Sequence, residues 1–231
     1  MDTIRFILVC AAVFLALLLA SRLFEAKFCK NRPRLSSAKY LCTVSMCAAL
    51  AAIAMLFEFP LPFLAPHFYQ IDLSELPLMI CGFYLGPTAG VLGELIKILL
   101  NLLIDGTETA YVGEFANFAV GCSLVVPAAM VYHVKKNRRS AILGLCVGTT
   151  ILAAFGSFFN AVYLLPAFSQ LYALPLESIV AMGGAINGGI RSITTLVLFA
   201  VFPLNLIKGA LVSVLTLLLY KKTERLLFKR T

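Results

Sequence analysis

Residues 90–104 read Gly-Val-Leu-Gly-Glu-Leu-Ile-Lys-Ile-Leu-Leu-Asn-Leu-Leu-Ile, an apolar stretch that carries two opposite charges. Glu94 and Lys97 lie three positions apart, so on a helix they share one face and can form an ion pair. A charge near the bilayer centre costs at least about 2.5–3.5 kcal/mol on insertion scales, so such residues usually face a partner or a cavity. The stretch therefore predicts a helix that lies among other helices in a membrane.

The composition of the whole chain agrees with this interpretation. The chain has 231 residues, of which 61% are hydrophobic and 13% charged, with a mean hydropathy of +0.96. Soluble domains are about 45–50% apolar and about 25% charged, and disordered chains are still more polar, so both classes are excluded. We expect seven apolar helices, at residues 6–20, 41–59, 76–85, 90–104, 113–132, 141–165 and 193–220. The third and fourth are shorter than the roughly 20 residues of a membrane span, so they recruit flanking residues or lie buried among neighbours.

The formal net charge of +8 comes mainly from three basic clusters, within residues 22–39, 135–139 and 221–230. With seven spans, all three fall on one side, which the positive-inside rule assigns to the cytoplasm. The N-terminus is then outside the cell and the C-terminus inside. The clusters are not interleaved with aromatic residues on one face, so no nucleic-acid partner is expected. The first segment could also be a cleaved signal peptide, but no small-x-small site precedes Arg22, so an additional helix is preferred.

Motifs for catalysis and metal binding are missing. The sequence has no GxxxxGK[ST] or HExxH motif, and its only histidines are His67 and His133. None of the seven cysteines forms a CxxC pair, and most lie in apolar segments, where cysteine packs as a small hydrophobic residue. We therefore expect no enzyme, metal, cofactor or disulfide.

Polar side chains instead interrupt the later spans. Glu114 and Asn117 lie three apart in the fifth span, Asn160 lies in the sixth, and Asn205 and Lys208 lie three apart in the last. Amides both donate and accept hydrogen bonds, so this set matches a flat, neutral heterocycle with alternating carbonyl and N–H groups. Each amide alone could equally join two helices, a contact worth roughly 0.6 kcal/mol.

Two segments between spans could cover such a site. Residues 59–72 are aromatic, contain three prolines and are expected to be extracellular. They form either a lid over an outward-facing pocket or an interfacial aromatic belt. Asp72 to Glu75 resembles a helix N-cap followed by an acidic first turn. Residues 166–187 are a second long loop and a candidate second lid.

Small residues recur at helical spacing in two places. Ala48 and Ala52 form a small-xxx-small pair in the second span, and Gly82, Gly86 and Gly90 repeat that spacing further on. Small residues let helices approach closely. The pattern indicates either packing within the chain or a docking face for a partner membrane protein.

Several of these motifs occur together and in order. They are Ile71-Asp72-Leu73-Ser74-Glu75-Leu76-Pro77, Gly86-Pro87-Thr88-Ala89-Gly90-Val91, Glu94-Leu95-Ile96-Lys97, Val112-Gly113-Glu114-Phe115-Ala116-Asn117-Phe118, Asn160 with Pro166, and Pro203-Leu204-Asn205-Leu206-Ile207-Lys208-Gly209. The series resembles the riboflavin-specific S components of energy-coupling factor (ECF) transporters, over about residues 41–220. The resemblance implies an all-α polytopic membrane protein with a six-helix S-component core at 41–220. Residues 1–40 would add an N-terminal helix and a basic linker, and 221–231 a basic cytoplasmic tail.

The resemblance also implies a function and partners. Such a subunit binds riboflavin from outside and delivers it for ATP-driven uptake, together with a transmembrane coupling subunit and two cytoplasmic ATPase subunits. By motif, Asn160, Asn205 and Lys208 match the positions that hold the isoalloxazine ring. The alternatives are an S component for another vitamin or flavin, such as folate or FMN, a membrane scaffold or channel, and a membrane enzyme.

Further residues take roles only through this resemblance. The segment that leads to Asp72 matches the lid over the ligand, and Tyr69, Gln70 and Asp72 are its candidate ligand-binding residues. Glu114 and Asn117 match positions in or behind the pocket. The alanine face at Ala48 and Ala52 is similar to the contact with the coupling subunit.

Overall fold

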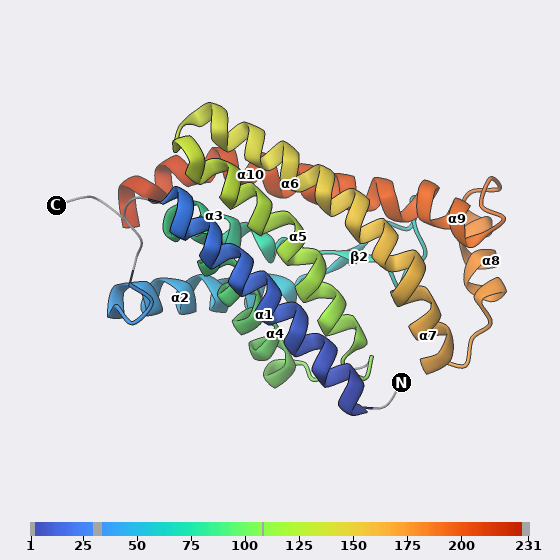
Figure 1. The fold of residues 1–231 in the computed structure, drawn as a ribbon. Helices are drawn as coiled ribbons and strands as arrows, with labels where there is room; N and C mark the ends of the chain where they lie inside the picture. The colour runs from blue at the N-terminus through green and yellow to red at the C-terminus, as the bar shows by residue number, and fades with distance from the viewer. Residues whose placement is uncertain (1–2, 30–33, 108, 228–231) are drawn as a thin grey trace.

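The computed structural model describes residues 3–29, 34–107 and 109–227, and it is a bundle of helices (Figure 1). The long helices are α1 (Thr3–Phe28), α2 (Ala38–Met55), α4 (Pro87–Ile104), α5 (Val112–Lys135), α6 (Arg138–Phe159) and α10 (Phe202–Leu227). The shorter ones are α3 (Glu75–Leu85), α7 (Leu165–Leu171), α8 (Leu176–Ile186) and α9 (Ile193–Leu196). Two π-helical turns, η1 (Asn160–Leu164) and η2 (Val197–Val201), join α6 to α7 and α9 to α10.

The predicted apolar helices are confirmed. Six helical stretches of the described chain are long and apolar enough to cross a membrane, and they include α1 and the continuous run from Ile193 to Leu219. The third predicted segment forms α3, which has 11 residues and is too short to span alone. The chain is a multi-pass membrane protein.

A tight turn at Gly86 joins α3 to α4. Gly86 has φ +118°, a conformation that favours glycine, and Pro87 follows as the first residue of α4. The other glycines of the spaced set lie against α5: a Cβ on Gly82 would lie 3.3 Å from Cβ of Ala129, and one on Gly90 would lie 2.8 Å from Cγ1 of Val125. These small residues therefore allow helices of the same chain to approach closely.

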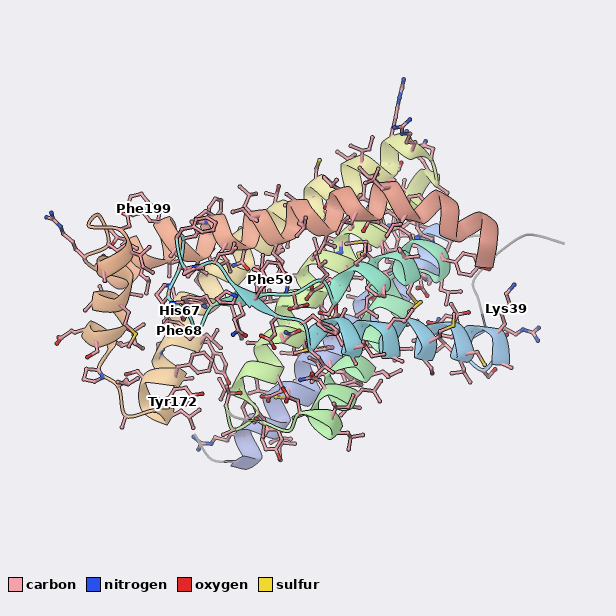
Figure 2. All side chains as sticks on the ribbon, turned by 180° about the vertical axis from the view of Figure 1, so that it is seen from behind. Lys39, Phe59, His67, Phe68, Tyr172 and Phe199 are labelled. Carbon is pink, nitrogen blue, oxygen red and sulfur yellow. The ribbon has the colours of Figure 1, made fainter. Side chains whose placement is uncertain are left out.

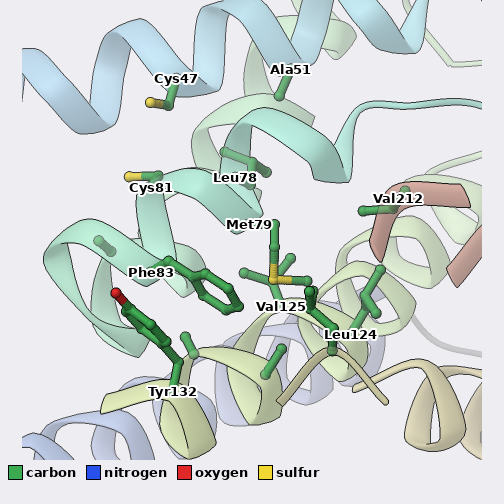
Figure 3. Packing of buried hydrophobic residues seen from close by; sticks show 14 of the residues in the cluster. Cys47, Ala51, Leu78, Met79, Cys81, Phe83, Leu124, Val125, Tyr132 and Val212 are labelled. Carbon is green, nitrogen blue, oxygen red and sulfur yellow. The ribbon is translucent and has the colours of Figure 1, made fainter. Parts of the chain in front are cut away.

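The interpretation of Ala48 and Ala52 as a docking face needs correction. Their exposed fractions are 0% and 1%, so neighbours in the same chain already cover them. Helix α2 packs against α3 and α4, and Ala48 and Ala51 lie in the apolar cluster with Leu78 of α3 (Figure 3). Lipid is as apolar as leucine, so close packing of small residues, rather than escape from water, stabilises this contact.

The two π-helical turns have matching sequences around them. Each begins six positions before a proline: η1 begins at Asn160 before Pro166, and η2 begins at Val197 before Pro203. Proline cannot donate a backbone hydrogen bond and its ring clashes with the preceding turn, so the helix widens locally. The N–H groups of Leu165 and Phe202 accordingly bond to the carbonyls five residues before them, at Asn160 and Val197.

The prediction of a loop over residues 166–187 is wrong, because α7 and α8 occupy most of this segment.

Helix α1 packs along α4 and α5. Its Phe14 ring meets Phe118, and its buried Glu25 accepts a 2.9 Å hydrogen bond from the backbone N–H of Thr88. Thr88 lies in the first turn of α4, where unpaired N–H groups and the helix dipole favour a carboxylate. A polar contact thus fixes α1 to the core of the bundle.

The ends of the bundle differ. The start of α2, the α5–α6 turn and the end of α10 lie toward the left in Figure 1, so the described residues of the three basic clusters share one end. Figure 2 shows Lys39 at that end and Phe59, His67 and Phe68 toward the other. The segment carrying these aromatics is closed by a short antiparallel pair, β1 (Phe59–Pro60) with β2 (Gln70–Ile71).

Candidate functional site

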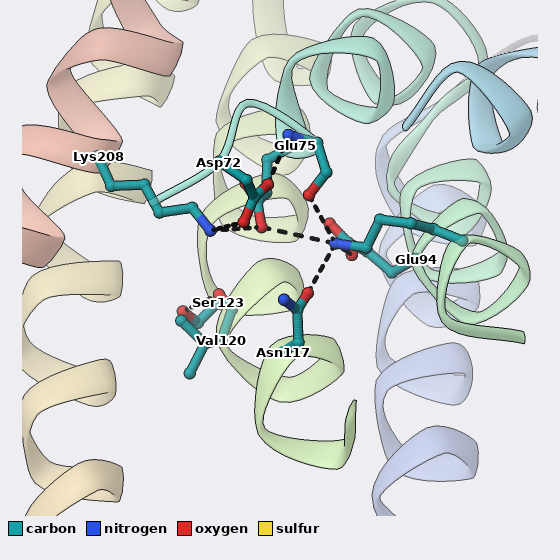
Figure 4. A network of polar contacts seen from close by, with 9 residues as sticks. Asp72, Glu75, Glu94, Asn117, Val120, Ser123 and Lys208 are labelled. Atoms are coloured by element: carbon teal, nitrogen blue, oxygen red, sulfur yellow. Dashed lines mark hydrogen bonds and ion pairs between the residues drawn. The ribbon is translucent and has the colours of Figure 1, made fainter. Parts of the chain in front are cut away.

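A network of buried charges joins four parts of the chain (Figure 4). Lys97 of α4 lies at one side of it. Its Nζ is 2.7 Å from Glu94 Oε2 and 3.5 Å from Glu75 Oε1, and it donates to Ser74 Oγ at 3.1 Å and to Asn117 Oδ1 at 2.8 Å. An ammonium has three N–H donors, so four acceptors saturate Lys97.

Lys208 of α10 lies at the other side. Its Nζ is 3.0 Å from Asp72 Oδ2 and 3.1 Å from Glu75 Oε1. Asp72 and Glu75 are its ion-pair partners among the residues that the structure describes, so two acceptors face three donors. Glu75 connects the two lysines, because its Oε1 contacts both.

Asn160 and Asn205 lie close to this side of the network. The Tyr69 hydroxyl donates a 2.6 Å hydrogen bond to Asn160 Oδ1. A Cβ on Gly156 would lie 2.9 Å from Asn205 Nδ2, so the Asn205 amide lies against α6 one turn before Asn160. Asn205 and Lys208 lie three apart on α10 and share a face. Both asparagines are buried, with exposed fractions of 5% and 8%.

The protonation states of Asp72 and Tyr69 follow from the groups around them. Burial alone would raise the pKa of the Asp72 carboxyl, but the Lys208 and Lys97 ammonium groups and hydrogen bonds from Ser74 lower it below its ordinary value. Asp72 is therefore a carboxylate. Burial raises the pKa of the Tyr69 phenol, so Tyr69 remains a neutral hydrogen-bond donor.

The structure brings together most of the predicted site residues, but not all. Tyr69 contacts Asn160, Asp72 contacts Lys208, and Asn205 lies against Gly156 of α6, one turn before Asn160.

Three other predicted residues lie differently. Asn117 contacts Lys97 and supports the network from behind. Glu114 accepts a hydrogen bond from the Thr109 hydroxyl at 2.8 Å, and Gln70 is exposed on β2. Within the described part of the chain, neither forms a hydrogen bond or ion pair with a residue of the network.

Sequence reasoning missed the role of Glu75. It interpreted this residue only as an acid in the first turn of a helix, whereas Glu75 is 1% exposed and bridges both lysines. A fully apolar short helix that begins with a carboxylate was the available signal, because such a charge needs a partner inside the membrane. The expected Glu94–Lys97 ion pair is present.

The arrangement offers groups that can bind a polar molecule: an ammonium donor, amide donors and acceptors, and a phenol. No group of three or more potential metal ligands occurs in the described part of the chain. Fold and site together define a polytopic membrane protein with a buried polar network and a candidate binding site.

Comparison with known proteins identifies the family. Residues 39–220 match the family model described as ECF transporter, substrate-specific component, and the chain belongs to this family. It is a membrane transport subunit and not an enzyme. Helix α1 lies outside the matched residues, in agreement with the expected additional N-terminal helix.

Curated relatives and a solved structure agree. The chain is 31% identical over 189 residues to riboflavin transporter RibU of Staphylococcus aureus, covering 82% of this chain and 92% of the relative. It is 32% identical over 187 residues to riboflavin transporter FmnP of Bacillus subtilis, covering 80% and 92%. A solved S component of a bacterial ECF transporter superposes with a TM-score of 0.64 at 31% identity, covering 83% of this chain and 98% of that one.

Proposed function

We propose that this chain binds riboflavin between α6, α10 and the segment before α3, and presents it for ATP-driven uptake. The observation that carries the proposal is that one segment contacts both helices, through Tyr69 to Asn160 and through Asp72 to Lys208, while Asn205 lies between α10 and α6. The third N–H of Lys208 and the two amides offer donors and acceptors to the carbonyl and N–H edge of a neutral heterocycle. The names of the two relatives support riboflavin as that heterocycle.

The proposed orientation follows from the charges. The end that carries the three basic clusters faces the cytoplasm, which places the N-terminus outside and the C-terminus inside. The site then lies toward the outer side, under the β1–β2 segment. Release inward requires partners, and we propose a transmembrane coupling subunit and two cytoplasmic ATPase subunits, in line with the family. Co-purification of ATPase subunits with the tagged chain tests this assembly, and recovery of the chain alone from intact membranes argues against it.

The test of ligand identity is an equilibrium titration of the purified full chain with riboflavin, FMN and folate. We expect riboflavin to bind and folate not to bind, because unmatched buried polar groups cost about 1–3 kcal/mol each. Tight binding of folate instead would identify an S component for another vitamin. Absence of binding by all three would leave a scaffold or channel and contradict the proposal.

The test of site position uses two matched asparagines. Asn205→Ala should weaken riboflavin binding by about tenfold, the effect of losing roughly 1.4 kcal/mol. Asn101→Ala is the control, because Asn101 is equally buried at 7% exposure but lies on α4, away from the α6–α10 contact. Equal affinity of the Asn205 variant and the unmodified protein would refute this site.

A further inference from the structure

The buried network has an odd number of charges. It contains three acids, Asp72, Glu75 and Glu94, and two bases, Lys97 and Lys208, and none is more than 8% exposed. From α5, the neighbouring groups are the Asn117 amide and the neutral Cys122 thiol, which add no positive charge. Glu25 of α1 lies elsewhere, at the start of α4. With every acid ionised, the membrane interior would hold one uncompensated negative charge, which costs several kcal/mol in a low-dielectric environment.

The three acids are not equally stabilised. Asp72 contacts Lys208 and accepts the Ser74 backbone N–H at 2.7 Å, and Glu75 contacts both ammonium groups. Among the described residues, Glu94 has Lys97 as its single ion-pair partner, and Lys97 also donates to Ser74 and Asn117.

The Glu94 carboxyl group is buried, with little else around it to stabilise a negative charge. Its exposed fraction is 0%, and apart from the 2.7 Å ion pair of Oε2 with Lys97, neither carboxyl oxygen has a hydrogen-bond partner among the described residues. The carboxyl group packs against Gly121, where an added Cβ would lie 2.7 Å from both oxygens. Glu94 is therefore the acid that gains least from being ionised.

We propose that Glu94 is a proton-binding site, which holds one proton in the folded protein at neutral pH. The proton makes the network electrically neutral and turns Glu94 into a hydrogen-bond donor. Glu75 keeps its charge in this assignment, because its Oε1 contacts both the Lys97 and the Lys208 ammonium groups. The site is separate from the ligand-contacting side at Lys208, and the inference does not depend on which ligand the protein binds.

Infrared spectroscopy of the full chain tests this directly. A protonated carboxyl group has a carbonyl stretch that a carboxylate lacks, and a maltoside detergent contributes no carbonyl of its own. We expect this band in the unmodified protein at neutral pH and its loss in Glu94→Gln. Glu114→Gln is the control and should keep the band, because Glu114 is half-buried in the first turn of α5. Absence of the band from the unmodified protein overturns the proposal, as does its persistence in Glu94→Gln.

Thermal unfolding gives an independent measurement. Glutamine resembles a protonated glutamate, so Glu94→Gln should unfold within a few degrees of the unmodified protein. Glu75→Gln should unfold at a clearly lower temperature, because it removes the charge that contacts both lysines. An equal fall of the unfolding temperature in Glu94→Gln and Glu75→Gln would mean that Glu94 is ionised, and it would overturn the proposal. If Glu94→Gln does not fold, Glu94→Asp should keep the carbonyl band at a shifted frequency, and an unshifted band would overturn the assignment.

Discussion

Lys97 and Lys208 belong to one ionic network, yet their surroundings differ. Lys97 is 0% exposed and has four acceptors within 3.5 Å, so every donor is used inside the protein. Lys208 has a 10% exposed side chain and two acceptors, and it lies one turn from Asn205. We infer that Lys97 holds helices together, and we propose that Lys208 keeps a donor available for a ligand. The same substitution at both lysines separates these roles.

Lys97→Met should have the largest effect. It removes the ammonium that contacts Glu75 and Glu94, so the carboxylates Asp72 and Glu75 share the single ammonium of Lys208. Removing one partner of a buried ion pair costs about 3–5 kcal/mol. We expect a large fall in the thermal unfolding midpoint and little folded protein. Lys135→Met, at an exposed position near the end of α5, is the control and should behave like the unmodified protein. A normal midpoint for Lys97→Met would show that the network does not stabilise the fold.

Lys208→Met should mainly affect binding. Asp72 keeps the Ser74 N–H and Glu75 keeps Lys97, so the loss of stability should be smaller than for Lys97→Met. Loss of a hydrogen bond from a charged donor costs about 1.5–3 kcal/mol, or ten- to more than a hundredfold in riboflavin affinity. Calorimetric titration and thermal unfolding of the same sample measure both effects. If Lys208→Met lowers stability as much as Lys97→Met and leaves affinity unchanged, the two lysines have the same role.

Tyr69→Phe should have a moderate effect. It removes the hydroxyl that orients the Asn160 amide, and a buried neutral hydrogen bond contributes about 0.5–1.5 kcal/mol. Riboflavin affinity should fall by about threefold to tenfold. Fluorescence titration checks this, with His67→Phe in the same segment as an exposed control. An equal loss of riboflavin affinity in Tyr69→Phe and His67→Phe would mean that any change in this segment weakens binding, and not the loss of this hydrogen bond in particular.

The helices could be predicted from the sequence because apolar length alone determines a membrane span. The contacts of the site could not. Asp72 and Lys208 are 136 positions apart, and no spacing rule pairs residues over that distance. Their pairing in sequence analysis came from the order of motifs in a resembling family. The same analysis assigned Ala48 and Ala52 to a partner, because small-xxx-small spacing predicts a close helix neighbour without saying which one.

The π-helical turns show another limit of sequence reasoning. Pro166 and Pro203 signal that a helix is disturbed, and Pro203 lies two positions before Asn205. A proline alone does not say whether the helix ends, kinks or widens. Here it widens, so α6 continues through η1 into α7, where the sequence predicted a loop.

Gln70 gives the smallest expected effect, and it marks the edge of the site on the Lys208 side. Alternate residues of an extended segment point in opposite directions, and Tyr69 and Ile71 are buried while Gln70 is exposed. An exposed side chain on β2 that faces away from Tyr69 should not touch a ligand held by Asn160 and Lys208. We therefore expect Gln70→Ala to change riboflavin affinity by less than about twofold, an effect smaller than roughly 0.4 kcal/mol. A tenfold loss would mean that β2 turns over when the ligand binds, so that the ligand contacts both faces of the segment.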